Sequence, residues 1–272
     1  MSRHKLPSVV ILFGFMVSAC ATSPSATPLQ KPTPAIEPLL ITPVESAFAP
    51  GNPTAAPLDD IRASDTVTFE AADGTMLTGE LYGSGKTAVI FSVMGDCTPG
   101  WREFAQLTAA QGLMALTYQW RGCRDFRLVD EDQNRSFVND ARGAINFVRE
   151  QGAEKVILVG ASLGGLASAK LAIESQAIGL VVVASPPAIS QWDFEIEPAD
   201  LDTDIPKLFI TAEHDPTVPA SATRQLYDLA AAPKEWQVYP GSEHGTDLFG
   251  AESGEEMQRR ILEFILTVAS TS

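Results

Sequence analysis

The chain has 272 residues, of which 45% are hydrophobic, and its formal net charge at neutral pH is −15. This size and apolar content are sufficient for one globular domain with a substantial core, or at most two small ones. The negative charge repels phosphate backbones and anionic lipid headgroups, so nucleic acid is not an expected partner. An acidic exterior that keeps the protein in solution explains the same charge without any functional meaning.

The N-terminus has the features of an export signal. Arg3, His4 and Lys5 precede the apolar run "LPSVVILFGFMV", which has signal-peptide length and is short for a membrane span. The next residues, "VSAC", end at Cys20 and resemble a bacterial lipoprotein signal, in which the cysteine is lipidated and becomes the first residue. We therefore expect residues 1–19 to be removed and the protein to lie outside the cytoplasm, lipid-anchored to a bacterial membrane. An ordinary secretory signal, with Cys20 incidental, is the alternative.

Residues 20–60 are expected to form a tether. The segment from residue 21 to about residue 60 contains nine of the 19 prolines, together with many Ser, Thr and Ala residues. Such a composition cannot form a helix or a central strand, and it has little to bury. It predicts an extended, semi-rigid spacer that carries a folded domain of residues 61–272.

In the folded part, short apolar runs alternate with helix-like segments. The runs at 66–71 and 77–83 predict an antiparallel strand pair around a turn at Asp73-Gly74. Strands that are apolar throughout must be covered on both faces, and alternation with helices provides that cover. The predicted fold class is therefore α/β: one doubly wound domain with a mostly parallel sheet. In chain order we expect strand 87–93, helix 101–112, strand 113–120, helix 135–152, strand 155–160, helix 163–175, strands 179–185 and 206–212, helix 220–232, strand 235–240 and helix 255–269.

The sequence Gly160-Ala161-Ser162-Leu163-Gly164 joins a predicted strand to a predicted helix. A serine on so sharp a turn needs small neighbours, because the strand and the helix nearly touch there. The turn presents the hydroxyl at the carboxyl edge of the sheet and at a helix N-terminus, which favours negative charge. Ser162 is therefore the candidate nucleophile. A glycine-rich turn with a helix-capping serine is the alternative.

A serine hydroxyl is a poor nucleophile until a base takes its proton, and a carboxylate usually orients that base. Of the three histidines, His4 lies in the signal, His214 is expected to be structural, and His244 follows the last predicted strand. Asp215 follows the strand before it. Because Ser162, Asp215 and His244 each come just after the carboxyl end of a predicted parallel strand, the three can converge into a catalytic triad.

A nucleophilic serine, then an aspartate, then a histidine along the chain is the order of the α/β-hydrolase superfamily. The resemblance covers residues 65–268 and is strongest to small dienelactone-hydrolase-like or esterase-like members without a large lid. Dienelactone hydrolases themselves use a cysteine nucleophile, so Ser162 argues against that reaction. If Asp215 is not the acid, Glu213 and Asp247 are the substitutes.

Hydrolysis also requires an oxyanion hole of two N–H donors, each worth roughly 3 kcal/mol of transition-state stabilisation. One donor is expected to be the backbone N–H of Leu163. The resemblance implies that the other lies in the loop 94–97, where relatives usually have His-Gly and this chain has Met94-Gly95. We expect Gly95 to donate, with Met94 as the alternative.

Two further cysteines, Cys97 and Cys123, are predicted just past the carboxyl ends of neighbouring strands. In an exported protein they are expected to form a disulfide, which would stabilise the fold by about 3–4 kcal/mol. Two unpaired thiols are the alternative. The sequence has no Cys/His cluster with metal-ligand spacing, so no metal is expected, and the chemistry requires no cofactor.

The segment between Ser185 and Pro206 is too short for the helical cap of larger relatives, so we expect an open, shallow site without a large cap domain. Trp192 and Phe194 are candidates for its flanks, with plain surface packing as the alternative.

These features predict a serine hydrolase that cleaves small-molecule carboxylic esters through an acyl-enzyme. A peptidase or amidase with the same triad is the second reading, although such relatives usually add a domain for which this chain has no room. A non-catalytic binding protein on the same scaffold is the third.

Overall fold

A sheet of eight strands organises the computed structural model, which describes residues 64–94, 100–121 and 136–271. The signal, the tether and Cys20 lie outside the described residues. The strands of this sheet are β1 (Asp65–Glu70), β2 (Met76–Tyr82), β3 (Thr87–Met94), β4 (Met114–Gln119), β5 (Lys155–Ser162), β6 (Gly179–Val183), β9 (Lys207–Ala212) and β10 (Lys234–Tyr239).

The spatial order of the strands is β1-β2-β4-β3-β5-β6-β9-β10. The six strands from β4 to β10 are parallel, while β2 pairs antiparallel with both β1 and β4. The predicted turn between β1 and β2 is present: the backbone N–H of Thr75 donates to Asp73 Oδ1 at 3.2 Å, and Gly74 has φ +83°. The mostly parallel sheet predicted from the alternation is confirmed.

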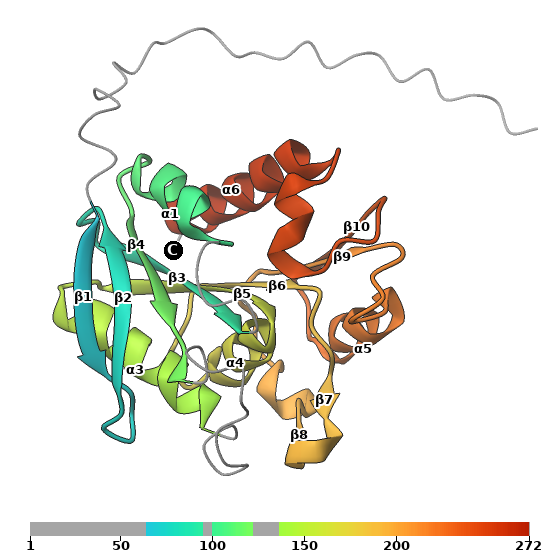
Figure 1. Cartoon of the computed structure of the whole chain (residues 1–272), viewed down its shortest axis with the longest axis horizontal. Coiled ribbons are helices and arrows are strands. Elements are labelled where there is room, and N and C mark those ends of the chain that lie inside the picture. Colours follow the sequence, from blue (N-terminus) through green and yellow to red (C-terminus); the bar gives the residue numbers. More distant parts are fainter. Residues whose placement is uncertain (1–63, 95–99, 122–135, 272) are drawn as a thin grey trace, which may run out of the picture. The chain divides into compact units, whose positions relative to one another are not determined.

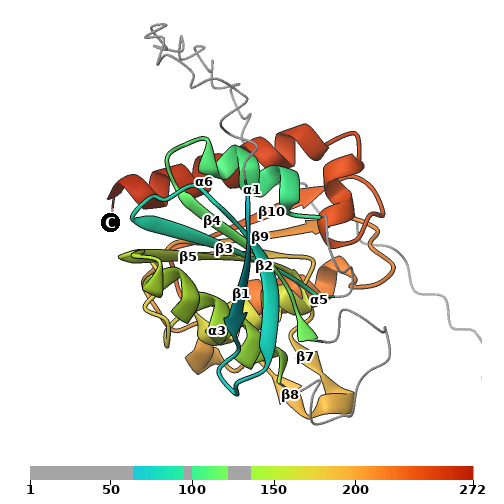
Figure 2. The same ribbon diagram turned by 60° about the vertical axis from the view of Figure 1, so that its left-hand side comes forward.

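Helices cover both faces of the sheet (Figures 1 and 2). Helices α1 and α6 lie on one face, and α3, α4 and α5 lie on the other, so the domain is doubly wound as predicted. Parallel strands joined by crossover helices require this arrangement, because each crossover must pack back onto the sheet. The helices are α1 (Arg102–Ala109), α3 (Phe137–Glu150), α4 (Leu163–Leu171), α5 (Ala220–Leu229) and α6 (Gly254–Thr271).

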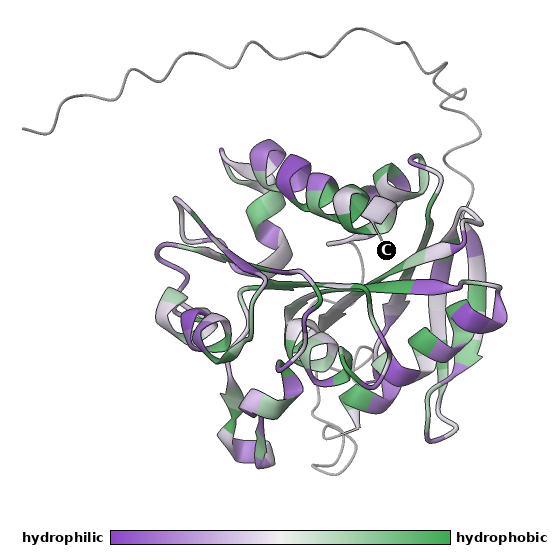
Figure 3. Ribbon diagram, turned by 180° about the vertical axis from the view of Figure 1, so that it is seen from behind, coloured by the Kyte–Doolittle hydropathy of each residue, from purple (hydrophilic) through white to green (hydrophobic). Residues whose placement is uncertain are grey.

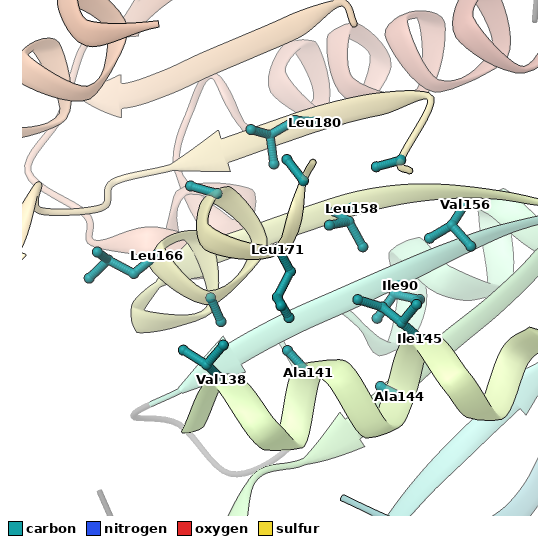
Figure 4. Close-up of a cluster of buried hydrophobic side chains, with 14 of the residues drawn as sticks. Ile90, Val138, Ala141, Ala144, Ile145, Val156, Leu158, Leu166, Leu171 and Leu180 are labelled. Atoms are coloured by element: carbon teal, nitrogen blue, oxygen red, sulfur yellow. The ribbon is translucent and has the colours of Figure 1, made fainter. Parts of the chain in front are cut away.

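Two hydrophobic cores, one on each face of the sheet, hold these layers together. Successive side chains of a strand point to opposite faces. In β5, Val156 and Leu158 pack in the core beneath α3 and α4, whereas Ile157 and Val159 pack in the core beneath α1 and α6. The central strands are accordingly apolar along their length (Figure 3), while the outer strands β1 and β10 carry exposed polar residues. Side chains of α3 and α4 pack against the central strands (Figure 4). Each fully buried side chain of this kind contributes about 1.5–3 kcal/mol.

The segment after β6 differs from the sequence prediction, which left it without structure. It forms a small antiparallel pair, β7 (Ala188–Ile189) and β8 (Phe194–Glu195), with the short helices η2 (Ser190–Trp192) and η3 (Pro198–Asp200). Strands of two residues carry too little periodicity to be detected in a sequence. As expected, the described residues contain no large cap domain.

No helix within the described ranges is both long enough and apolar enough to cross a bilayer.

An ion-pair network joins the turn between β1 and β2 to the start of α3. The backbone N–H and Nε of Arg121 donate to the two oxygens of the fully buried Asp140, each at 2.8 Å. Nη2 of Arg121 lies 2.7 Å from Asp73 Oδ2. Burial raises the pKa of Asp73, but the hydrogen bonds from Arg121 and Thr75 outweigh this and bring that pKa to about 2.

The Asp73 carboxylate should therefore stabilise the fold above about pH 4 and lose that contribution as the pH falls toward 2. Its pKa is lower in the folded chain than in the unfolded one, so the unfolded chain binds more protons in this window. Because 31% of the side chain is exposed, we expect an effect on the order of 1 kcal/mol. Urea unfolding should show Asp73→Asn less stable than wild type at pH 6, with a gap that narrows toward pH 2. A gap that does not change with pH contradicts this account.

Candidate active site

Ser162 is the last residue of β5, and α4 begins at the next residue, Leu163. The serine has φ +54° and ψ −126°, a backbone conformation that residues with a Cβ rarely adopt. Such strain costs on the order of 1–3 kcal/mol and persists only where the surrounding structure enforces it. The strand runs two residues further than predicted, directly into the serine.

Close approach of strand and helix enforces this turn. A Cβ built on Gly160 would collide with the carbonyl oxygen of Gly164 and would lie 2.6 Å from the backbone nitrogen of Gly165. A Cβ on Gly165 would in turn collide with the hydroxyl of the buried Ser185. Backbone contact therefore requires glycine at position 160, as the sequence suggested. At position 165, glycine leaves room for the side chain of Ser185.

We expect Gly160→Ala to lower the free energy of unfolding by about 3 kcal/mol, because the colliding atoms belong to the backbone and cannot rotate away. Gly250→Ala is the matched control, since an added Cβ meets nothing within 4 Å and the φ of Gly250 is not positive. Urea denaturation of both variants measures the difference. Equal stability of the two variants would contradict the close strand–helix contact.

Asp215 and His244, which follow β9 and β10, are hydrogen-bonded to each other. His244 Nδ1 lies 2.7 Å from Asp215 Oδ2, and the Asp215 side chain is fully buried. The other oxygen, Oδ1, accepts the backbone N–H groups of Thr217 at 2.8 Å and Val218 at 2.9 Å. A carboxylate held in this way accepts a hydrogen bond from Nδ1–H, which leaves the lone pair of the neutral imidazole on Nε2.

Asp215 thus also forms a local turn. A turn-forming aspartate is the alternative to a catalytic role at this position. One oxygen closes the turn and the other holds the imidazole, so the two roles do not exclude each other. The two backbone donors at Thr217 and Val218 were not predicted. The signal for them is the aspartate itself, whose side chain commonly accepts N–H groups two and three residues further on.

The other candidates from the sequence do not take part in this pair. Glu213, His214 and Asp247 are all exposed to solvent. Of the three carboxylates considered, the structure pairs Asp215 with His244.

Backbone hydrogen bonds fix the two loops that carry the aspartate and the histidine. The N–H of Glu213 donates to the carbonyl of Tyr239, and the N–H of His214 donates to the carbonyl of Gly241, both at 2.9 Å. These bonds continue the pairing of β9 with β10 beyond the strand ends. The exposed His214 therefore has a structural role through its backbone.

The loop after His244 meets the end of β5. A Cβ built on the buried Gly245 would lie 3.6 Å from the Cβ of Ala161, the residue before Ser162. Among the residues that the structure describes, no hydrogen bond joins the Ser162 hydroxyl to the His244 ring. In unliganded enzymes this contact is often long and shortens when substrate binds.

Leu163 is the first residue of α4, so its N–H belongs to the helix terminus that has no intrahelical partner. Met94, the last residue of β3, is the register partner of Ser162. The chain therefore leaves β3 beside the candidate nucleophile. Gly95, the expected second donor of the oxyanion hole, lies outside the described residues, and so do Cys97 and Cys123. The disulfide between these cysteines stays a prediction.

Trp192 and Phe194 pack against the start of α3. Trp192 is 5% exposed, with its ring centroid 5.9 Å from that of Phe137, and the Phe194 ring lies 5.1 Å from Phe137. Trp192 therefore belongs to the core on that side of the sheet and Phe194 packs against it, which is core packing rather than the surface packing given as the alternative.

A cavity of about 210 Å³ lies between β2, β4 and the start of α1. Neither the candidate nucleophile nor the histidine–aspartate pair is among its described lining residues. Within the described ranges, no cluster of His, Cys, Asp and Glu side chains could hold a metal ion.

Comparison with known proteins identifies the family. A model of the alpha/beta hydrolase family matches residues 97–241, which is more than half of the chain. The chain therefore belongs to the alpha/beta hydrolase family, as the order of the three site residues had suggested. A comparison with curated proteins gives no match.

Solved structures with this fold include several esterases. An esterase of Pyrococcus furiosus superposes with a TM-score of 0.60 at 15% identity, covering 78% of this chain and 95% of its own. The esterase domain of a Rhodothermus marinus protein gives a TM-score of 0.55 at 18% identity, covering 72% and 98%. CarC, a serine hydrolase involved in carbazole degradation, gives 0.58 at 14% identity, covering 75% and 100%. At these identities the likeness concerns the fold.

Proposed function

We propose that this chain is a serine hydrolase that cleaves carboxylic esters of small molecules, with Ser162, Asp215 and His244 as its catalytic triad. The observation that carries the proposal is the 2.7 Å bond between His244 Nδ1 and the buried Asp215, in a loop that meets the strand ending at Ser162. The esterases that share the fold support the same class of reaction.

In the proposed first step, Nε2 of His244 takes the proton of the Ser162 hydroxyl while Oγ attacks the acyl carbon of the ester. The ring then carries a positive charge, which the Asp215 carboxylate stabilises and orients through Nδ1–H. The carbonyl oxygen becomes an oxyanion, and the N–H of Leu163 at the N-terminus of α4 donates to it. We assign the second donor to Gly95.

The alcohol then leaves with the proton returned by His244, and the acyl group stays on Ser162. Water, deprotonated by the same imidazole, attacks this acyl-enzyme and releases the acid. All groups that move a proton in this cycle belong to the chain itself, so the proposal requires no cofactor.

A fluorophosphonate probe tests this mechanism, because it reacts covalently with an activated serine. The folded protein should be labelled on the peptide that contains Ser162, and Ser162→Ala should not be labelled. Labelling elsewhere, or none in wild type, overturns the proposed nucleophile and favours a non-catalytic binding protein on this scaffold.

Ester and amide cleavage are then separated by substrate. We expect p-nitrophenyl esters of short or medium acyl length to be hydrolysed and aminoacyl anilides to be cleaved at least about 100-fold more slowly. Faster cleavage of the anilides would establish a peptidase or amidase with the same triad.

We further propose that the protein acts outside the cytoplasm, tethered to a bacterial membrane by lipid on Cys20. The basic start, the apolar run and "VSAC" support this location, as does the proline-rich segment that follows. Each buried methylene of an acyl chain contributes about 0.8 kcal/mol, so two or three chains anchor stably. Fractionation should place wild type in the membrane and Cys20→Ser in the soluble fraction.

A disulfide between Cys97 and Cys123 is proposed for the exported protein. Mass spectrometry without reduction should find these two cysteines in one linked peptide pair. Two free, alkylatable thiols would contradict it.

A further inference from the structure

We propose that Gly100 and Thr246 are positioning residues that set where His244 stands relative to Ser162. This inference rests on the proposed function, because it concerns the base of the proposed triad. The base is held on one side by its hydrogen bond to Asp215. The structure provides a second support on the other side, at the start of α1.

His244 immediately precedes η4 (Gly245–Gly250), a short helix whose first turn closes on the histidine itself. The N–H of Asp247 donates to the carbonyl of His244 at 3.0 Å. Any shift of η4 therefore carries the backbone of the histidine with it. What holds η4 in place also holds the base.

Two aromatic contacts fasten η4 to the start of α1. The ring of Phe249 lies 5.3 Å from Trp101 in an edge-on arrangement and 5.5 Å from Phe104. Trp101 is itself fixed, because it is 1% exposed and its indole N–H donates to the carbonyl of Ser92 in β3. The beginning of α1 therefore supports η4. Helix α1 lies on the same face of the sheet as α6 (Figure 1).

Gly100, just before α1, adjoins Thr246 in η4. A Cβ built on Gly100 would collide with the Thr246 hydroxyl and would lie 2.6 Å from its Cβ and 2.9 Å from its Cγ2. Rotation of the threonine cannot remove the clash with its own Cβ. A side chain at position 100 must therefore push the backbone of Thr246 away by about 1 Å to reach ordinary contact.

Thr246 stands two residues after His244, and a Cβ built on the intervening Gly245 would lie 3.6 Å from the Cβ of Ala161. Displacement of Thr246 should therefore move the imidazole relative to the serine. A misplacement of about 1 Å in a catalytic group can cost about 100-fold in rate. Glycine at position 100 therefore has a proposed effect on catalysis that acts through Thr246.

We expect Gly100→Ala to lower kcat for a p-nitrophenyl ester about 30–100-fold while KM changes less than about twofold. The double variant Gly100→Ala/Thr246→Gly removes the three atoms nearest to the new Cβ, all of which belong to the Thr246 side chain. Its kcat should return to within about fivefold of that of Thr246→Gly alone, which is the coupling expected for residues in contact. Failure of the double variant to recover would overturn the positioning role.

Gly179→Ala is the matched control for simple overpacking. A Cβ on Gly179 would lie 2.9 Å from Val268 Cγ1, at the amino end of β6 and therefore at the sheet edge opposite the site. This variant should lose stability and keep the kcat of wild type. A similar fall in kcat for Gly179→Ala and Gly100→Ala would mean that destabilisation alone explains the loss.

A second readout does not depend on activity. The proton that His244 Nδ1 shares with Asp215 should give a low-field NMR resonance, shifted in Gly100→Ala and unchanged in Gly179→Ala. If Ser162→Ala retains full esterase activity, the proposed function fails while this resonance still tests the positioning. If Ser162→Ala is inactive but Gly100→Ala has wild-type kcat and an unshifted resonance, the positioning role alone fails.

Discussion

Ser162→Gly should abolish ester hydrolysis and at the same time make the protein more stable. Because Ser162 is the proposed nucleophile, its loss should remove the acyl-enzyme route, and we expect kcat/KM to fall about 10⁵-fold or more. The serine has φ +54°, which glycine adopts without strain. Relief of that strain should raise the free energy of unfolding by about 1 kcal/mol, after allowance for the greater freedom of glycine in the unfolded chain.

Ser162→Ala separates the two effects. Alanine lacks the hydroxyl but keeps the Cβ, so this variant should be as inactive as Ser162→Gly without its gain in stability. Ester hydrolysis and urea unfolding of the three proteins measure both quantities. A glycine variant less stable than wild type would mean that the serine is kept for the fold. An active glycine variant would mean that another residue is the nucleophile.

Asp215→Asn should reduce kcat by about 10⁴-fold while leaving the fold intact. Oδ1 of Asp215 is held by the N–H groups of Thr217 and Val218, so the carbonyl oxygen of an asparagine will occupy that place. Its NH₂ group then faces Nδ1 of His244. A donor at that point requires Nδ1 to accept, which places the proton on Nε2 and removes the base.

Glu213→Gln is the control for this prediction. It makes the same chemical change at an exposed carboxylate two residues away, and kcat should change less than about twofold. Kinetics with a p-nitrophenyl ester and labelling by a fluorophosphonate should respond in parallel. An Asp215→Asn enzyme with more than about a tenth of wild-type kcat would show that the imidazole does not depend on this carboxylate.

The sequence features that predicted the fold are mostly local in the chain. Strong apolar runs fix β3, β5, β6 and β9 because each strand is buried on both faces. The apolar stripe of α3, formed by Phe137, Val138, Ala141, Ile145 and Val148, is buried as its spacing predicts. The glycine-flanked Ser162 marks the strand-to-helix turn, since only small residues permit that approach. Spacing and residue type were sufficient at these points.

Element ends and weak elements were less predictable. The helix expected to reach residue 175 ends at Leu171, and the chain turns at Gln176 with φ +52°. β7 and β8 have two residues each and exist because they pair with each other. Pairing partners and helix ends depend on tertiary contacts, which the local pattern does not contain.

The sequence alone predicted the fold class, the candidate nucleophile Ser162 and a short list of residues that could complete the triad. That list contained one histidine beyond the last strand and three carboxylates. Only the tertiary structure shows which of those carboxylates pairs with the histidine: Asp215 is buried and hydrogen-bonded to His244, while Glu213 and Asp247 are exposed to solvent. It also decided that η4 rests on the start of α1, through residues far apart in the chain. The physical reason is the sequence separation of the interacting residues. Turns and periodic burial depend on residues that are close in the sequence, whereas a hydrogen bond between two loops depends on how the whole sheet brings the loops together.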